Sequence, residues 1–294
     1  HGIGRRQRQM CIRDRNNTFS SSSSTFSNEN ASGNHINYGV REFGMSAIMN
    51  GMVLHGAIKP YGATFLVFTD YARNAVRLSA LMKLPNIFVY THDSVALGED
   101  GPTHQPIEHM VTLRSTPNLN NWRPADLVET AVSWKSAVSS QKTPTCLIYT
   151  RQGTSAIKRS PDQISMIDMG GYLLEESDDF DLTIVASGSE VQLALDAAKE
   201  LKNDSINANV VSMPCLDIFL DQDKEYQNKI INPEKPVLVV ECAHPNSWYR
   251  ILNRNDKVIG IETFGESAPG SELLNHFGFN TDNVIKTAKS LIND

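Results

Sequence analysis

Short apolar segments alternate with amphipathic segments along most of this chain, and this alternation is the feature that most constrains its fold. Continuous apolar runs, such as NIFVY at 86–90 and TCLIYT at 145–150, are typical of strands buried on both faces. Between such runs, segments like 41–56 carry apolar residues at helical spacing. Strands alternating with helices predict an α/β fold with mainly parallel sheets and right-handed crossovers.

The pattern divides into two α/β units. We predict a first unit over 33–152, a linker over 153–181, where periodicity is weak, and a second, smaller unit over 182–294. In the first unit we expect an apolar run at 64–70, helices at 41–56, 71–84 and from Pro124 to about 139, and strands at 86–90 and 145–150. In the second we expect strands at 182–187, 209–213, 236–241 and 257–262, a helix to about 202 capped by Ser189 and Gln192, and a last helix at 282–292.

Residues 1–32 differ from the rest. The segment RRQRQMCIRDR at 5–15 carries five arginines, and 16–28 is mostly Asn, Ser, Thr and Phe. The segment has no apolar region of the kind a secretory signal needs. It could be a basic targeting or nucleic-acid-binding arm, but we favour a disordered or non-native tail and leave it out of the predicted fold.

Bulk composition excludes several classes of function. The formal charge of −6 and a pI near 5.8 argue against an extended nucleic-acid surface, which needs clustered Lys and Arg. No stretch approaches the roughly 20 apolar residues of a membrane span. Scattered cysteines without a C-x-x-C pair predict no zinc site and fit a reducing cytoplasm: Cys11, Cys146, Cys215 and Cys242.

The densest chemical cluster is the loop THDSVALGEDGPTHQP at 91–106, directly after a predicted strand. In α/β sheets, ligands bind beyond the carboxyl ends of the strands. Two imidazoles, His92 and His104, together with carboxylates such as Asp100, could move protons near neutral pH. A polar surface loop is the alternative. The spacing of the two histidines matches no common ligand pattern, so we predict no metal site.

Two further features fit such a site less specifically. Glu42 begins a predicted helix, where a carboxylate is also favoured simply by the helix N-terminus. Phe65, Phe68 and Tyr71 could line a pocket or belong to an ordinary core. Because residues 65 and 68 point to opposite faces of a regular strand, a shared pocket requires the strand to end or bend before Phe68.

Taken together, five segments resemble transketolase in their order and spacing: GVREFGM at 39–45, TFLVFTDYARNAVR at 64–77, YTHDSVALGEDGPTHQP at 90–106, RQ at 151–152 and ETFGESAPGSELLNHFGF at 262–279. The resemblance implies a thiamine diphosphate-binding fold. It consists of a pyrimidine-binding domain, here N-terminally truncated, followed by the transketolase C-terminal domain. His92 favours transketolase over deoxyxylulose-phosphate synthases, which resemble it but typically have Asp-Arg at this position and the next.

The resemblance also implies roles for individual residues. Glu42 would hydrogen-bond N1′ of the cofactor's aminopyrimidine, and Phe68 would stack on that ring with Phe65 and Tyr71 beside it. His92 and His104 would bind substrate oxygens and assist proton transfer. Asp100 would contact the acceptor's hydroxyl, and Arg151 the substrate phosphate.

The implied activity is transfer of a two-carbon ketol unit from a ketose phosphate to an aldose phosphate, in the pentose phosphate pathway of the cytoplasm. The Gly-Asp-Gly motif, by which the family's diphosphate-binding domain holds Mg²⁺ or Ca²⁺, does not occur in this sequence. We therefore expect a fragment that is inactive alone, with the C-terminal subunit of a split transketolase as the alternative. The expected partner is a second copy or a separate diphosphate-binding chain. A deoxyxylulose-phosphate synthase-like enzyme and a non-catalytic dimerisation module also stay open.

Overall fold

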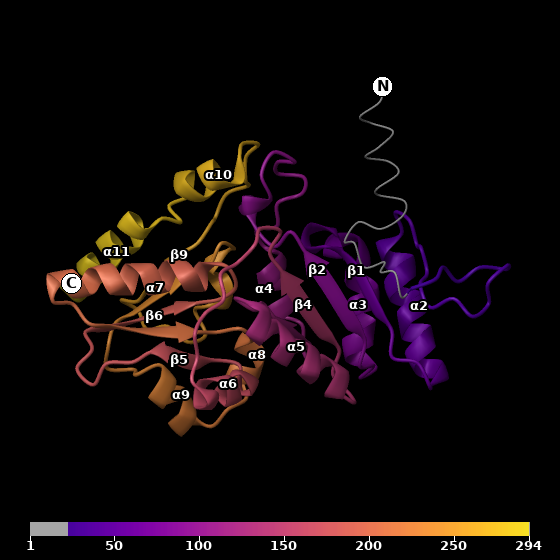
Figure 1. Cartoon of the computed structure of the whole chain (residues 1–294), viewed down its shortest axis with the longest axis horizontal. Coiled ribbons are helices and arrows are strands. Elements are labelled where there is room, and N and C mark those ends of the chain that lie inside the picture. The colour runs from indigo at the N-terminus through magenta and orange to yellow at the C-terminus, as the bar shows by residue number, and fades with distance from the viewer. Residues whose placement is uncertain (1–22, 294) are drawn as a thin grey trace.

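The computed structural model describes residues 23–293, which form two α/β units that lie side by side along the long axis (Figure 1). The first unit contains α2 (Glu42–His55), β1 (Tyr61–Phe65), η1 (Leu66–Phe68), α3 (Thr69–Leu81), β2 (Ile87–Thr91), η2 (Val95–Leu97), α4 (His109–Arg114), β3 (Asn120–Trp122), α5 (Leu127–Ser139) and β4 (Thr145–Tyr149). Its four strands are all parallel, in the order β1-β2-β4-β3.

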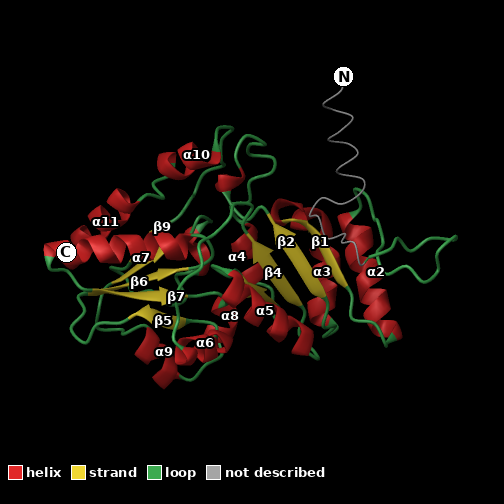
Figure 2. Ribbon diagram, viewed as in Figure 1, coloured by secondary structure: helices red, strands yellow, loops and turns green. Residues whose placement is uncertain are grey.

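The second unit has a five-stranded sheet in the order β5-β7-β6-β8-β9, with helices on both faces (Figure 2). It contains α6 (Pro161–Met166), η3 (Ile167–Met169), β5 (Tyr172–Glu175), β6 (Leu182–Ala186), α7 (Glu190–Leu201), η4 (Lys202–Asp204), β7 (Ala208–Ser212), α8 (Leu216–Leu220), α9 (Lys224–Ile230), β8 (Val237–Val240), η5 (Pro245–Ser247), β9 (Lys257–Ile259), α10 (Gly270–His276) and α11 (Thr281–Asn293). Only β5 runs antiparallel to its neighbour β7 in this sheet.

The buried strands and long helices confirm the predicted α/β class. The first unit also meets the requirement that its first strand end before Phe68. The strand β1 ends at Phe65, and the short η1 turn begins at Leu66, so Phe68 lies beyond the strand. The helix predicted from Pro124 begins later, at Leu127. The reason is its cap: the Asp126 carboxylate accepts hydrogen bonds from the first backbone N–H groups of α5.

Two expectations for the second half of the chain differ from the structure. Within the predicted linker 153–181, β5 joins the second sheet through β7, and α6 precedes it with a capping box from Ser160 and Gln163. The predicted cap at Ser189 is absent, because Ser189 already has helical backbone angles and its hydroxyl donates to Glu190 instead.

The predicted tail over 1–32 falls mostly outside the described residues. Its described part begins at Ser23 and makes two isolated bridges, Thr25 with His35 and Ser27 with Asn30. The domain boundaries proposed from the sequence therefore stay predictions. Among residues 23–293, no helix is both long and apolar enough to cross a membrane.

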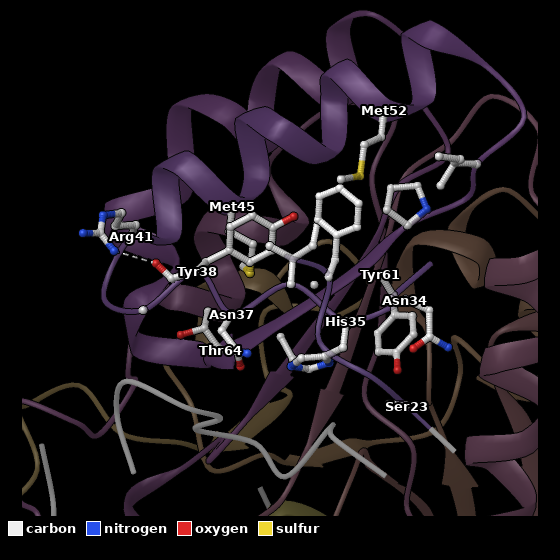
Figure 3. Close-up of a pocket in the computed structure, with 18 of the residues that line it drawn as sticks. Ser23, Asn34, His35, Asn37, Tyr38, Arg41, Met45, Met52, Tyr61 and Thr64 are labelled. Carbon is white, nitrogen blue, oxygen red and sulfur yellow. Dashed lines mark hydrogen bonds between the residues drawn. The ribbon is translucent and has the colours of Figure 1, made fainter. Parts of the chain in front are cut away.

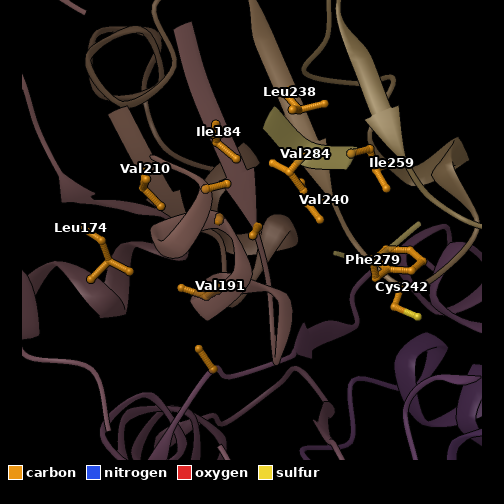
Figure 4. Close-up of a cluster of buried hydrophobic side chains, with 14 of the residues drawn as sticks. Leu174, Ile184, Val191, Val210, Leu238, Val240, Cys242, Ile259, Phe279 and Val284 are labelled. Carbon is orange, nitrogen blue, oxygen red and sulfur yellow. The ribbon is translucent and has the colours of Figure 1, made fainter. Parts of the chain in front are cut away.

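One buried hydrophobic cluster runs through both units. Figure 4 shows its part in the second unit, where strand residues such as Ile184 and Val240 pack against Val191 of α7 and Val284 of α11. The same cluster includes Trp122 and Leu147 of the first sheet, along with many other side chains. The two units therefore share a continuous core and are expected to unfold cooperatively.

Ion pairs buried between the two units add a polar connection to this core. Arg123, which follows β3 and is only 1% exposed, donates from Nε to Asp93 at 2.9 Å in the first unit. From Nη1 it donates to the carbonyl of Ser187 at 2.8 Å and pairs with Glu190 in the second. A charge withdrawn from water this far is tolerated only because partners of opposite sign surround it.

A second buried pair lies nearby. The guanidinium of Arg114 in α4 holds both carboxylate oxygens of Glu241, at 2.7 and 2.8 Å, in the forked arrangement that makes such pairs strong. Burial would raise the pKa of Glu241, but the Arg114 guanidinium outweighs it and lowers the pKa of this carboxyl to about 2.

Replacing Arg123 should weaken the whole fold. We expect Arg123→Met to lower the free energy of unfolding by about 3–5 kcal/mol, because Asp93 and Glu190 would be left as buried charges without their partner. Urea denaturation measures the change. Lys135→Met is the matched control: it breaks an exposed pair with Asp168 and should cost at most about 1 kcal/mol. Equal losses in the two variants would contradict this account.

The free energy of unfolding should also depend on pH through Glu241. A carboxyl with a folded-state pKa near 2 stabilises the fold above its ordinary pKa of 4.5, and this stabilisation is lost as the pH falls from about 4.5 towards 2. Glu241→Gln should therefore show a shallower decline in the free energy of unfolding over this range than the unmodified chain. Urea denaturation at a series of pH values tests it, with the exposed Glu200→Gln on α7 as control. Parallel pH profiles for all three proteins would refute the assignment.

Candidate active site

Four rings gather beyond the carboxyl ends of the neighbouring strands β1 and β2. The ring of Phe65 stacks on the imidazole of His92, with centroids 3.7 Å apart and planes 22° apart. The ring of Phe68 meets His104 edge-on at 5.4 Å and lies 5.8 Å from Phe65. We call Phe65, Phe68, His92 and His104 the ring cluster. It combines flat apolar faces with two groups that can carry protons.

Tyr71 lies at the margin of this cluster. Its ring is 6.0 Å from Phe68, in the first turn of α3, and the residue is 67% exposed. The sequence-predicted aromatic set is thus brought together, with Tyr71 as its solvent-facing member.

Both imidazoles are held at Nδ1 by a threonine directly before them. The hydroxyl of Thr91 lies 2.8 Å from Nδ1 of His92, and that of Thr103 lies 2.9 Å from Nδ1 of His104. These contacts leave Nε2 of each ring to act towards a ligand. The sequence reasoning missed the two threonines, although the repeated Thr-His pair was a signal for them.

The backbone at His92 is also unusual. Its φ of +61° lies in the left-handed region, which non-glycine residues seldom adopt and which histidine tolerates better than most. Its neighbour Asp93 is buried and bound to Arg123, which helps to hold the chain in this conformation. Backbone outliers of this kind are concentrated at functional sites.

The charges around His92 favour its neutral form. Burial lowers the pKa of His92, and the Arg151 guanidinium lowers it further, while the carboxylates of Asp100 and Asp93 oppose both effects. Two more predicted site residues, Arg151 and Asp100, therefore lie close enough to act on this imidazole. Both are exposed and can reach a ligand from solvent.

The second unit supports the loop that carries the histidines. The side-chain amide of Gln105 donates to the carbonyls of Gly98 at 3.0 Å and of Glu266 at 2.8 Å, and Ser267 Oγ donates to the carbonyl of Glu99. Figure 1 shows α10 and the segment before it beside this loop. At Gly270, a Cβ atom would come within 2.3 Å of the Ala96 carbonyl oxygen, so the two backbones are in direct contact.

Glu42 is not among the residues of the ring cluster. It begins α2, is 7% exposed, and lines a cavity of about 640 Å³ formed by residues 23–42, α2 and β1 (Figure 3). Thr64 also lines this cavity, and the next residue is Phe65 of the ring cluster. The cavity lining among the described residues does not include either imidazole. That Glu42 and the two histidines act on one ring therefore stays a prediction.

Models of two known domain families match this chain. A model of the transketolase pyrimidine-binding domain matches residues 6–155, and one of the transketolase-like C-terminal domain matches residues 170–280. The first match begins well before residue 33, where the sequence pattern placed the start of the first unit. The fold is thus that of a pyrimidine-binding domain joined to a transketolase-like C-terminal domain.

Comparison with individual proteins narrows this class. The chain is 49% identical over 279 residues to transketolase 1 of Vibrio parahaemolyticus, covering 94% of this chain and 42% of that protein. It superposes on the Pichia stipitis transketolase complex with sedoheptulose 7-phosphate with a TM-score of 0.89 and 42% identity, over 94% of this chain and 41% of that one. The chain belongs to the transketolase family, and it spans about two fifths of the length of these relatives.

A structure described as a split gene transketolase, an inactive beta4 tetramer, matches with a TM-score of 0.73 and 26% identity. This match covers 88% of the present chain and 84% of that one. The two chains therefore match over most of the length of each.

The protonation of His92 tests the arrangement around it. Arg151→Gln should raise the pKa of His92 because it removes a neighbouring positive charge, and Asp100→Asn should lower it because it removes a negative one. An NMR titration of the His92 ring protons measures both shifts without requiring activity. Arg254→Gln, an exposed arginine of the second unit, is the control and should leave this titration unchanged. Shifts of the same sign in the two site variants would contradict the arrangement.

Proposed function

We propose that this chain supplies the pyrimidine-binding side of a thiamine diphosphate site and works in ketol transfer between sugar phosphates. The single observation that carries the proposal is the ring cluster, in which Phe65 stacks on His92 and Phe68 meets His104 at the strand ends. When bound, thiamine diphosphate supplies the carbon nucleophile and electron sink for cleavage of a ketose. The chain's own groups position that cofactor and move protons.

The donor set fits an aminopyrimidine ring. Such a ring is flat and apolar on its faces and hydrogen-bonds at its edge, so it needs an aromatic partner and an acidic one. Phe68 offers a ring face, with Phe65 and Tyr71 beside it. Glu42, buried at the start of α2, would hold the ring nitrogen N1′ through a proton on its carboxyl group.

The two histidines would act on the sugar. With Nδ1 held by a threonine hydroxyl, each imidazole would present Nε2 to a substrate oxygen. The lowered pKa of His92 keeps the ring neutral at pH 7, so it can accept a proton. Asp100 would hydrogen-bond a hydroxyl of the acceptor, and Arg151 would bind the substrate phosphate with its guanidinium.

Activity would require a diphosphate-binding component that holds the metal ion and the other end of the cofactor. We propose a homodimer or an assembly with a separate chain of that kind, in the cytoplasm, where thiols such as the buried, free Cys146, Cys215 and Cys242 stay reduced. The split-gene structure favours the second arrangement, in which this chain is one subunit of a two-chain transketolase.

Reconstitution tests the proposal. The purified chain is mixed with the diphosphate-binding domain of the Vibrio parahaemolyticus relative, thiamine diphosphate and Mg²⁺, and ketol transfer from a ketose phosphate is assayed. We expect activity from the mixture and at least a 100-fold loss with Glu42→Ala or His92→Ala, the order of magnitude typical when a group that moves a proton is removed. Calorimetry should show weak cofactor binding by this chain alone.

The exposed Glu200→Ala on α7 serves as the control and should retain full reconstituted activity. If the mixture transfers ketol units equally well with Glu42→Ala, the chain is not part of the active site and acts as an assembly module instead. If the product is a deoxyxylulose phosphate, the assignment to transketolase chemistry is wrong.

A further inference from the structure

We propose that Asp70, Glu108 and His109 form a binding site for one divalent transition-metal cation, with Zn²⁺ the best match. One donor atom from each of the three residues lies within 4.8 Å of the others. The site is separate from the ring cluster, shares no residue with it, and does not depend on the proposed function. We call these three residues the acidic-histidine site.

The spacing of one pair of donors, Asp70 and His109, suits ligands that share an ion. Asp70 Oδ2 lies 3.2 Å from His109 Nε2, and Glu108 Oε2 lies 3.8 Å from His109 Nδ1. Two donors that each bind Zn²⁺ at about 2.1 Å in a tetrahedron lie about 3.4 Å apart. The Asp70–His109 distance is close to this value. Glu108 lies nearest to the other ring nitrogen, Nδ1, so its carboxylate, on a side chain that is 54% exposed, would have to turn towards the Nε2 side to bind the same ion.

The state of His109 is the second, independent observation. The side chain is only 4% exposed, yet both ring nitrogens are closed off from solvent and make no hydrogen bond to any described residue. A buried polar atom without a partner is costly, and native proteins nearly always satisfy it. The carboxylates of Asp70 and Glu108 lie at ion-pair distance from the two ring nitrogens without hydrogen-bonding to them, and a cation bound at Nε2 would give that nitrogen a ligand bond.

Charge and donor type point to the same class of ligand. Two carboxylates and a neutral imidazole carry two negative charges, which one divalent cation neutralises. An imidazole nitrogen with carboxylate oxygens suits Zn²⁺, whereas Ca²⁺ and Mg²⁺ prefer oxygen ligands alone. Three protein ligands leave a fourth position for water. The alternative to a metal ion is a proton, because a positively charged imidazole between the two carboxylates would need no metal.

The position of this site gives a bound cation a structural role. Asp70 is in the first turn of α3, two residues after Phe68, and His109 begins α4, five residues after His104. A shared ion would tie the starts of the two helices together next to the ring cluster. The sequence offers no signal for it, because Asp70 and the Glu108–His109 pair are far apart in the chain and match no common spacing.

Metal titration of the full chain tests the proposal. We expect Zn²⁺ to bind with a stoichiometry of one in calorimetry, and Co²⁺ to give the visible absorption bands of a low-symmetry site. Zn²⁺ should also raise the unfolding temperature, since a ligand that binds only the folded state stabilises it. His109→Gln should weaken binding by about 100-fold or more, given that even residues one step removed from a metal change affinity by about 10- to 100-fold.

His276→Gln is the matched control, because His276 also faces a carboxylate, that of Glu266, but is 61% exposed and offers no third ligand. It should bind Zn²⁺ as the unmodified chain does. If His109→Gln does not fold, the double variant Asp70→Asn, Glu108→Gln replaces it, since both side chains are exposed. The proposal is wrong if Zn²⁺ does not bind, which favours the protonated imidazole, or if Cys11→Ser rather than His109→Gln abolishes binding.

Discussion

The buried guanidinium of Arg123 is the interaction on which the rest of the structure depends. It lies between two α/β units and binds Asp93 of the first and Glu190 of the second. Isolated, each of these charges would be strongly disfavoured in the interior, and together they are tolerated only in one relative placement of the units. Apolar packing supplies the bulk of the stability, but it is non-directional. The directional ion pairs select how the two sheets meet.

The relative placement of the two units also affects the candidate active site. Asp93 follows His92 directly, so the group that joins the two units is also the group that holds the unusual backbone of a proposed proton carrier. Gln105 and Ser267 add contacts between the same loop and the second unit. The C-terminal domain thus contributes to the site by fixing the conformation of a loop, while every residue of the ring cluster comes from the first unit.

Much of the fold could be predicted from the sequence, for an identifiable physical reason. Strands such as β2 and β8 are buried on both faces and therefore consist of uninterrupted apolar residues. The elements that were missed lack this signal. The strand β3 is the short polar segment Asn120–Trp122, which joins its sheet through backbone pairing with β4, and β5 has only four residues. Neither leaves a periodic pattern in the chain.

The candidate site was predictable to a different extent. A motif places residues in order along the chain, and it led us to expect Phe65, Phe68 and the two histidines at one site; their rings lie together in the structure. A motif does not show which residues from distant segments will contact the site. Arg123 and Glu241 belong to no recognisable motif, and their neighbours in the sequence do not indicate that they become buried charges. Their roles follow only from tertiary packing.

The contact of Gly270 with the Ala96 carbonyl has a consequence for how this protein can change over time. The start of α10 and the η2 turn, which are distant along the chain, touch backbone to backbone, with no side chain between them to absorb a change in either. A larger residue or an added one on one side would have to be matched by a retreat on the other. We expect these two segments to evolve as a pair, and a chimera that takes them from different ancestors should pack poorly where they meet.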